Sequence, residues 1–312
     1  MKIFAFDDSG RSRLGVMTSD THFVALADVA PEFPDSLIAI LDNDNGLDRV
    51  EQAVAGVIGD RALADVRRIA FLDRPNAIWA LGLNFKTHIR ETGLTTSDKY
   101  PHAFLRTAAS LVGADEPLRA PSEDVARAYD YEGELGVVIG KPGRFIPKEH
   151  ALSHVAGYTC VNEGSVREYQ VHNRQFALGK NFEASGSYGP WLVTPDAFGD
   201  PASHTLITRL NGIVRQRSKL DDMLFDVAAV ISYLSEGYTL NPGDLIAMGT
   251  PGVLKPQPGD KEGNDLDRQF GLFKIPGLVH MRPGDVVEVE IDGIGTLTNK
   301  VVGDQPRAYR AG

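Results

Sequence analysis

The sequence predicts a strand-rich α+β protein, and three observations lead to that prediction. Short runs of β-branched and aliphatic residues recur between Gly, Pro and Asp. Two of these runs directly follow Pro-Gly-Asp turns that begin at Pro242 and Pro283. Few helical segments interrupt the strand-like runs in the second half of the chain, chiefly 225–234. Because helices do not alternate regularly with strands, we expect a mixed or antiparallel β-roll or sandwich, not a doubly wound parallel sheet.

The chain length and one break in the pattern predict two domains. A chain of 312 residues corresponds to about two domains of ordinary size. The segment Asp73-Arg74-Pro75-Asn76 interrupts the periodic pattern. We therefore expect a small N-terminal α+β domain over residues 1–73 and one large domain over residues 74–312.

Each domain is expected to contain particular elements. Residues 1–27 alternate short β-like runs with polar turns, and residues 34–60 carry apolar positions at helical spacing. The stretch 255–277, rich in Pro, Gly and Asp, is expected to be a long loop of the kind found at active sites or interfaces. The strands expected in the large domain are 78–81, 131–140, 159–163, 191–194, 205–210, 244–248 and 286–291.

Composition limits the partners and the compartment. A formal net charge of −10 argues against nucleic acid or an anionic membrane as a partner, because both require a basic face. Cys160 is the only cysteine, so no internal disulfide can form, which fits a reducing cytoplasm. No apolar run approaches 18 residues, so neither a signal peptide nor a membrane span is expected.

Three glutamates are candidate metal ligands. Glu132 and Glu134 are two residues apart on a predicted strand and should project from the same face, where their charges repel unless a cation or a shared proton is present. Glu163 ends another β-branched run. Three carboxylates without a Cys or His cluster suit Mg²⁺ or Mn²⁺, with Ca²⁺ as an alternative, better than zinc. The alternative is an edge strand with two solvated glutamates.

His88 and Glu91 are candidates for acid–base chemistry. They are three residues apart in a segment, 84–93, that has the pattern of a short helix, so their side chains should be neighbours. A carboxylate beside an imidazole fixes its tautomer and raises its basicity, as a water-activating base requires. An ordinary pair on the helix surface is the alternative.

Other candidate residues follow the predicted strands. A helix is expected to start at Glu163 and to place Arg167 and Gln170 on one face. Lys180 could stabilise a developing negative charge on a 2-oxo acid, although most lysines are simply solvated. Thr250, in the turn Met248-Gly249-Thr250-Pro251-Gly252, could bind a carboxylate through its hydroxyl and neighbouring N–H groups, or could belong to a plain turn.

Taken together and in order, these motifs resemble the fumarylacetoacetate hydrolase family from about Ile78 to about Val302. The matching segments are 84–91, 130–135, 157–163, 175–182, 189–194 and 249–251. The resemblance implies a mixed β-roll, a homodimer, and a divalent ion held by Glu132, Glu134 and Glu163. It also implies a catalytic His88–Glu91 dyad and an active-site lysine at Lys180.

The chain departs from the family pattern at three positions. Glu163 stands where the family usually has Asp, and Thr87 stands where Asp often precedes the histidine. The Thr-Pro turn is one residue shorter, reading Thr250-Pro251-Gly252-Val253.

The leading functional hypothesis is a cytoplasmic, metal-dependent hydrolase that cleaves a C–C bond in a 2,4-dioxo acid such as an acylpyruvate. Its substrate-binding residues would be Arg167, Gln170 and Thr250. One alternative is a decarboxylase, isomerase or hydratase of 2-oxo acids on the same fold. Another is a non-enzymatic metal- or ligand-binding relative, because fold alone does not prove function.

Overall fold

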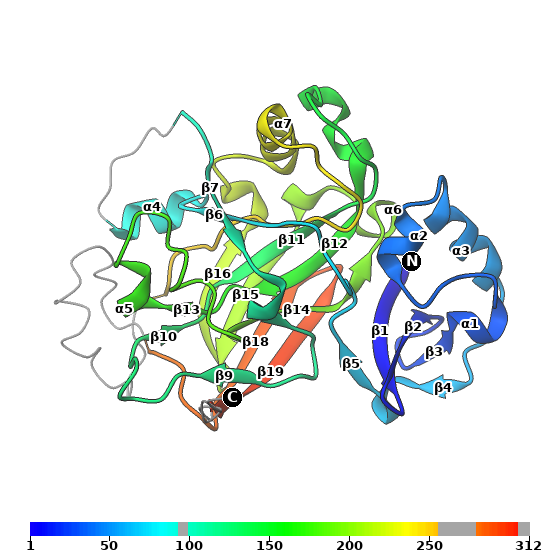
Figure 1. Cartoon of the computed structure of the whole chain (residues 1–312), viewed down its shortest axis with the longest axis horizontal. Coiled ribbons are helices and arrows are strands. Elements are labelled where there is room, and N and C mark those ends of the chain that lie inside the picture. The colour runs from blue at the N-terminus through cyan, green and yellow to red at the C-terminus, as the bar shows by residue number, and fades with distance from the viewer. Residues whose placement is uncertain (93–98, 255–278, 305–312) are drawn as a thin grey trace, which may run out of the picture.

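The computed structural model describes residues 1–92, 99–254 and 279–304, and it confirms the strand-rich α+β class (Figure 1). The expected loop over 255–277 lies outside the described residues. The helices are α1 Leu26–Val29, α2 Leu37–Leu41, α3 Gly46–Val54, α4 Lys86–Thr92, α5 Arg167–Gln170, α6 Pro195–Phe198 and α7 Val227–Gly237. None of the helices among these residues is long and apolar enough to cross a membrane.

A large mixed sheet forms the centre of the molecule. Its strands run in the order β4-β3-β2-β1-β14-β12-β11-β17-β6-β7, with β5 paired to β1 and β8 paired to β14. Their bounds are β1 Lys2–Asp8, β2 Arg11–Met17, β3 His22–Ala25, β4 Arg61–Ala62, β5 Arg67–Ile69, β6 Ile78–Gly82, β7 His102–Arg106, β8 Leu111–Val112, β11 Gly133–Ile139, β12 Val155–Asn162, β14 Gly186–Val193 and β17 Leu245–Ala247.

A second sheet packs against one face of the first. Its strands run in the order β16-β15-β18-β19-β9, and β10 and β13 form a separate two-stranded pair. Their bounds are β9 Leu118–Ala120, β10 Tyr129–Asp130, β13 Ser165–Val166, β15 Thr205–Leu210, β16 Ile213–Lys219, β18 Val286–Ile291 and β19 Gly295–Gly303. The predicted strands 205–210 and 286–291 therefore have the bounds that the sequence indicated.

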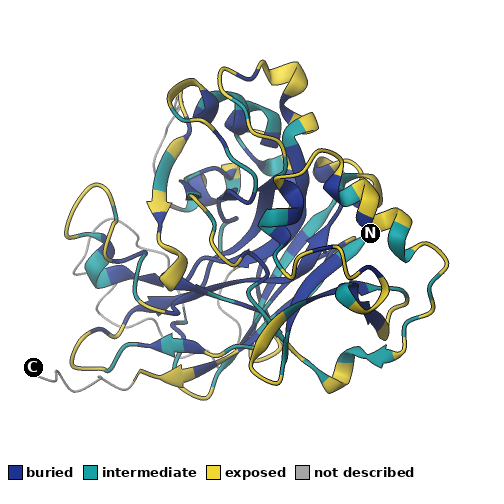
Figure 2. Ribbon diagram, turned by 45° about the vertical axis from the view of Figure 1, so that its right-hand side comes forward, coloured by how far each residue is buried: buried dark blue, intermediate teal, exposed yellow. Residues whose placement is uncertain are grey.

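The side chains of β11 alternate between two hydrophobic clusters. Leu135, Val137 and Ile139 pack with residues of α7 and of the second sheet, whereas Val138 packs with residues of β6 and β17 on the opposite face. This period-two alternation buries both faces of the strand, and Figure 2 shows the central strands as the buried layer of the molecule. Glu132 and Glu134 therefore lie in the protein interior and not on an edge strand.

The N-terminal segment joins the central sheet directly. In β1, Lys2 and Ile3 pair antiparallel with Val193 and Leu192 of β14, so β1 to β5 extend the same sheet. The helical pattern predicted over 34–60 is realised as two short helices, α2 and α3, separated by a turn at Asn45, whose φ is +55°. The domain boundary near residue 73 remains a prediction.

Candidate active site

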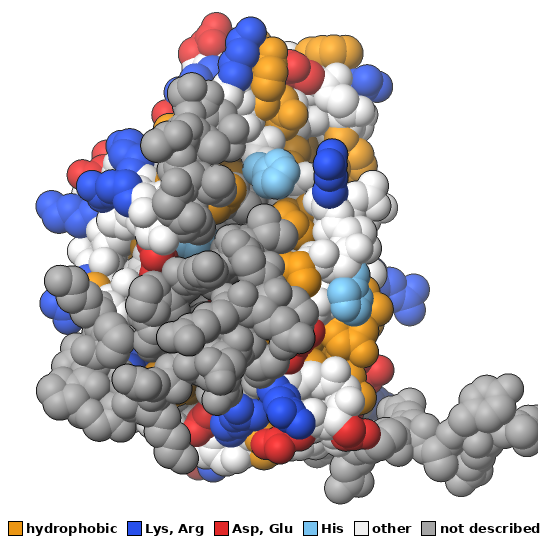
Figure 3. Space-filling view, turned by 90° about the vertical axis from the view of Figure 1, so that its left-hand side faces the viewer, with side chains coloured by type: hydrophobic (Ala, Val, Ile, Leu, Met, Phe, Trp, Pro, Cys, Tyr) orange, Lys and Arg blue, Asp and Glu red, His pale blue; other side chains and the backbone are white. Residues whose placement is uncertain are grey.

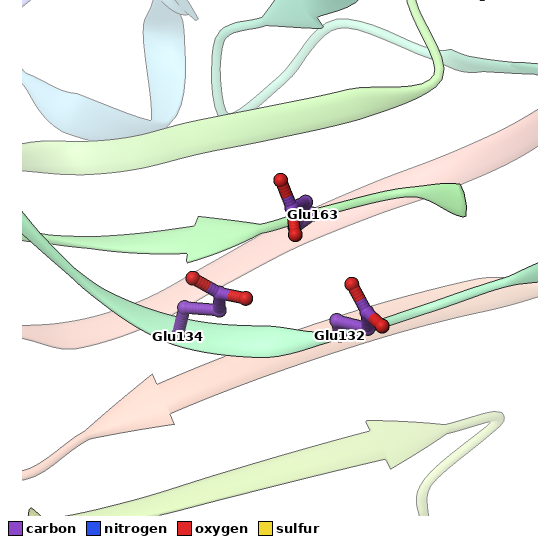
Figure 4. Close-up of side chains that lie close together, drawn as sticks. All are labelled: Glu132, Glu134 and Glu163. Carbon is purple, nitrogen blue, oxygen red and sulfur yellow. The ribbon is translucent and has the colours of Figure 1, made fainter. Parts of the chain in front are cut away.

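Three glutamates converge at one end of the central strands β11 and β12. These strands pair antiparallel with Gly133 opposite Asn162, so the start of one meets the end of the other. Glu132 precedes β11 by one residue, and Glu163 follows β12 directly. The three side chains are buried, with carboxylate oxygens within 4.8 Å of one another, and they face a common space (Figure 4). The alternative of solvated glutamates on an edge strand is wrong.

Burial and mutual repulsion disfavour the charge of two of these glutamates. The pKa of Glu134 is raised well above its usual value by burial and by the charges of Glu163 and Glu132. Burial, together with Glu132, also raises the pKa of Glu163, although Lys180 and Arg106 oppose that shift. Gly249 N–H donates to Glu134 Oε2 at 2.7 Å, but Glu134 Oε1 has no hydrogen-bond partner among the described residues.

Buried cations surround the glutamates. The Lys180 ammonium donates to Glu132 Oε2 and, at 2.8 Å, to Glu163 Oε2. The Arg167 guanidinium lies 2.7 Å from Glu132 Oε1, and its Nε donates to Asp130 Oδ2 at 2.9 Å. Burial raises the pKa of Glu132, but the positive charges of Arg167 and Lys180 outweigh burial and hold this pKa well below its usual range.

A third buried cation, Arg106, approaches Glu163 from β7. Its Nη1 lies 3.4 Å from Glu163 Oε1 and donates to the Gly164 carbonyl at 3.1 Å. Its Nε and Nη2 donate to the hydroxyls of Ser110 and Ser185. The side chain is only 1% exposed, so this guanidinium cannot exchange its protein partners for water without structural change.

The donor set fits a hard divalent cation. Carboxylate oxygens are the ligands that Mg²⁺, Mn²⁺ and Ca²⁺ prefer. Glu134 has an oxygen without a partner among the described residues and a pKa raised by burial and by like charges, and a bound cation would satisfy that oxygen and favour the ionised form. Glu132, Glu134 and Glu163 are therefore the residues that could hold such an ion.

His88 and Glu91 lie beside the same space. His88 Nδ1 is 3.2 Å from Glu91 Oε2, and both side chains are largely buried, so the alternative of a surface pair is wrong. Glu91 Oε1 also accepts a hydrogen bond from the Val253 N–H at 3.1 Å. This bond connects the C-terminal end of α4 to the Thr-Pro turn. Because the carboxylate accepts the proton on Nδ1, Nε2 is the nitrogen left to accept a proton.

Thr87, one of the three departures from the family pattern, links α4 to two other segments. Its hydroxyl donates to Asp222 Oδ2 at 2.7 Å, and its N–H donates to the same oxygen at 2.9 Å. The Gly252 N–H donates to the Thr87 hydroxyl at 3.3 Å. Thr87 thus connects the helix that carries His88 to the shortened turn and to Asp222.

The turn after β17 closes one side of the site. Gly249 has φ of +87°, and a Cβ there would lie 2.8 Å from the Cβ of Asn84, so this position favours glycine. The Thr250 hydroxyl donates to the Gly133 carbonyl at 3.0 Å and accepts from Gln216 Nε2 at 2.7 Å. These contacts fix Thr250 against the start of β11.

The segment after Glu163 differs from the expectation. The prediction of a helix starting at Glu163 is wrong, because β13 intervenes to pair with β10 and α5 begins only at Arg167. Arg167 and Gln170 nevertheless share one face, with Nη1 donating to Gln170 Oε1 at 2.8 Å. Lys180 is 2% exposed, so the interpretation as a solvated surface lysine is also wrong.

One narrow cavity of about 40 Å³ brings the predicted site residues together. Glu91 does not line it but lies behind His88. Its wall includes eight of the nine residues proposed from sequence, namely His88, Glu132, Glu134, Glu163, Arg167, Gln170, Lys180 and Thr250. Arg106, Asp130 and Gln216 were not predicted as site residues from the sequence; of these, only Asp130 lies within one of the segments that match the family.

The comparisons with known proteins agree with this geometry. A family model described as fumarylacetoacetate (FAA) hydrolase C-terminal matches residues 77–302. The chain belongs to the fumarylacetoacetate hydrolase family. A 2,4-didehydro-3-deoxy-L-rhamnonate hydrolase from Sphingomonas sp. is 35% identical over 303 residues, covering 96% of each protein. An oxaloacetate tautomerase from Xenopus laevis is 33% identical over 303 residues, covering 96% of this chain and 89% of the relative.

Solved structures show the same fold over the whole chain. The fumarylacetoacetate hydrolase from Exiguobacterium antarcticum has a TM-score of 0.76 at 34% identity and covers 97% of this chain and all of its own. A maleylpyruvate hydrolase from Sphingobium sp. SYK-6, crystallised with manganese(II) and pyruvate, has a TM-score of 0.76 at 26% identity and covers 98% and 100%. Relatives within this enzyme family thus include both hydrolases and tautomerases.

Proposed function

We propose that this family member is a metal-dependent hydrolase that cleaves the C3–C4 bond of a 2,4-dioxo acid. One observation carries the proposal: three buried carboxylates and the imidazole of a buried His–Glu pair line the same cavity. The names of two relatives, a rhamnonate-derivative hydrolase and a maleylpyruvate hydrolase, support this reaction type.

The chain would hold Mg²⁺ or Mn²⁺ through Glu132, Glu134 and Glu163. When bound, such an ion would supply a Lewis acid for the carboxylate and 2-oxo group of the substrate. A manganese(II) ion and pyruvate in the maleylpyruvate hydrolase structure support this choice of cation and of substrate end.

His88 would act as the general base. Glu91 holds the proton on Nδ1, so Nε2 would take a proton from water as that water adds to the C4 carbonyl. The C3–C4 bond then breaks to release a carboxylic acid and the enolate of pyruvate, which takes up at C3 the proton that His88 accepted. No oxidant, reductant or second substrate other than water is needed.

The buried cations would stabilise the charge that develops on the departing pyruvyl group. The Lys180 ammonium and the Arg167 guanidinium both line the cavity, where burial away from bulk water strengthens their interaction with an oxyanion. Gln170 Oε1 and Asp130 orient Arg167 through hydrogen bonds. Substrate contacts by Arg167, Gln170 and Thr250 are part of this proposal.

A second candidate function is tautomerisation of a 2-oxo dicarboxylate. The oxaloacetate tautomerase from Xenopus laevis and a Bacillus subtilis relative of the same name, 35% identical over 242 residues, favour it. An imidazole that can accept and return a proton at Nε2 suits proton transfer between carbon and oxygen as well as activation of water.

A turnover assay distinguishes the two candidates. Purified protein with Mn²⁺ is incubated with a series of acylpyruvates, and pyruvate is measured by coupling to lactate dehydrogenase. Loss of the enol absorbance alone is insufficient, because ketonisation and hydrolysis both remove it. Hydrolysis requires one pyruvate per substrate consumed. Enol loss without pyruvate release across the series would favour the tautomerase and reject the hydrolase.

We further propose that the protein functions as a homodimer in the cytoplasm. The family resemblance supports the dimer, and the single, buried Cys160 is compatible with a reducing compartment.

A further inference from the structure

The cavity that holds the three carboxylates adjoins a larger outer cavity. Three side chains line both cavities: His102 and Phe104 of β7, and Phe176. The outer cavity has a volume of about 340 Å³, against about 40 Å³ for the inner one. The inner volume has room for only about three water molecules, at roughly 10–15 Å³ each. A substrate whose reacting end lies there must therefore extend outward past these three residues.

The described residues of the outer cavity wall are largely apolar, and one of them is a permanent cation. Trp79 and Leu105 add apolar surface to that of Phe104 and Phe176, and Arg174 contributes a guanidinium. The rings of Phe104 and Phe176 pack edge to face with their centroids 5.8 Å apart. This contact fixes the shape of the boundary between the two cavities. None of the described residues that line the outer cavity is Asp or Glu.

Arg174 differs from the other arginines near the site. Arg106 and Arg167 are buried and ion-paired, whereas Arg174 is exposed and makes no ion pair within residues 1–92, 99–254 and 279–304. In a chain with a formal net charge of −10, an arginine that makes no ion pair among the described residues can serve an anionic ligand. Figure 3 shows the face of the molecule on which α4 and α5 lie, where hydrophobic, histidine, cationic and acidic side chains all reach the surface.

We propose that the outer cavity binds the part of the substrate beyond its reacting carbonyl, and that Arg174 selects substrates whose far end carries a carboxylate. The inference rests on the proposed function, because it assumes that a 2-oxo acid is held at the inner cavity. A planar guanidinium can pair with a carboxylate through two parallel hydrogen bonds. The apolar walls suit the methylene or alkene groups between the two ends.

The test measures binding, not turnover. Isothermal titration calorimetry with Mn²⁺-loaded protein compares 2-oxoadipate, 2-oxopimelate and 2-oxosuberate with the 2-oxo monocarboxylates of six, seven and eight carbons. These acids lack a C4 carbonyl, so they cannot be hydrolysed at C3–C4. Three lengths are used so that one can span the two cavities. At the best length, the dicarboxylate should bind about 10-fold more tightly than its monocarboxylate, as expected for one charge-assisted hydrogen-bonded pair.

Three variants identify the cause of that preference. Arg174→Gln should abolish the preference and leave monocarboxylate binding unchanged, and Arg174→Lys should restore part of it. Arg144→Gln removes an exposed arginine elsewhere on the surface and should keep the full preference, which controls for net charge. Raising the salt concentration should weaken binding of the dicarboxylate more than binding of the monocarboxylate, because Arg174 is exposed.

The possible failures are distinguishable. The role of Arg174 would be overturned if the dicarboxylate and the monocarboxylate bound with equal affinity at every chain length. It would also be overturned if Arg174→Gln reduced both affinities equally. Either result would leave the proposed function intact. If Mn²⁺ binds but neither acid does, recognition of 2-oxo acids is refuted, and the proposed function and this inference fail together.

Discussion

Replacing Glu134 by Gln should have opposite effects on stability with and without a divalent ion. Gln keeps the length of the side chain and an acceptor for the Gly249 N–H, but it removes the charge. Glu134 Oε1 is buried without a hydrogen-bond partner among the described residues, and two other carboxylates face it. In EDTA, the variant should therefore be more stable than the wild type.

The sizes of the two effects follow from the structure. Leaving a buried polar group unsatisfied costs on the order of 1–3 kcal/mol, so this is the gain expected for Glu134→Gln in EDTA. With Mn²⁺ at 100 times its dissociation constant, the wild type should gain about 2.7 kcal/mol. For a domain of this size class, that gain corresponds to roughly 5–10 °C in Tm. The variant should gain much less, because it lacks one anionic ligand.

The pH dependence provides an internal check. The pKa of Glu134 is raised in the folded chain, so the folded state binds a proton more tightly than the unfolded state does. The protonated Glu134 side chain contributes its full stabilisation of the folded state below about pH 4.3, the pKa of an unfolded glutamate. This stabilisation is lost as the pH rises through the pKa of Glu134 in the folded chain. In EDTA, the advantage of the variant should therefore be small near pH 4 and grow with pH.

Differential scanning fluorimetry from pH 4 to 8, with EDTA or Mn²⁺, measures these effects. Glu149→Gln, which neutralises an exposed glutamate, is the matched control and should follow the wild type. A Glu134→Gln protein that melts below the wild type in EDTA at pH 8 would refute the electrostatic reasoning. If Mn²⁺ raised the Tm of Glu134→Gln as much as that of the wild type, Glu134 would be refuted as a ligand.

Three further predictions concern catalysis, metal binding and assembly. His88→Ala or Glu91→Gln should lower kcat for acylpyruvate hydrolysis by about 10²–10⁴-fold with little change in Mn²⁺ affinity, and wild-type turnover by His88→Ala would reject its role as the base. Arg106→Gln should tighten Mn²⁺ binding because it removes a buried positive charge beside Glu163 Oε1, and Arg106→Lys, which keeps that charge, should bind Mn²⁺ more like the wild type; calorimetry that gives one affinity for all three proteins would contradict this. Light scattering should give twice the monomer mass of 33.9 kDa, and the monomer mass at micromolar concentration would reject the dimer.

The sequence indicated those features of the site that depend on local patterns. Glu132 and Glu134 could be assigned to one face because period-two projection needs only the neighbouring residues. His88 and Glu91 could be paired because three-residue spacing defines a helix face. The strand over 286–291 had the predicted bounds because a Pro-Gly-Asp turn precedes its β-branched run.

The features that were missed depend on contacts between distant segments. Arg106 reaches the Gly164 carbonyl across 58 residues, and Gln216 contacts Gly133 across 83 residues. Both contacts follow from strand order and register, which single-segment periodicity does not determine. The error at Glu163 has a similar cause, because β13 forms only through its pairing with β10.

The charges of the inner site explain how an acidic protein can bind an anion in its interior. When all its carboxylates are ionised, the buried cluster has four negative and three positive charges, which leaves one negative charge in excess. Its members are Asp130, Glu132, Glu134, Glu163, Arg106, Arg167 and Lys180. Addition of a divalent ion leaves one positive charge in excess, and the carboxylate of a 2-oxo acid then makes the cluster neutral. Because isolated charges are costly in a buried site, this balance favours ion and monoanion bound together over either one alone. The same balance leaves no inner cation for a second carboxylate, so a dicarboxylate substrate would need a partner outside the cluster, and Arg174 is placed to provide one.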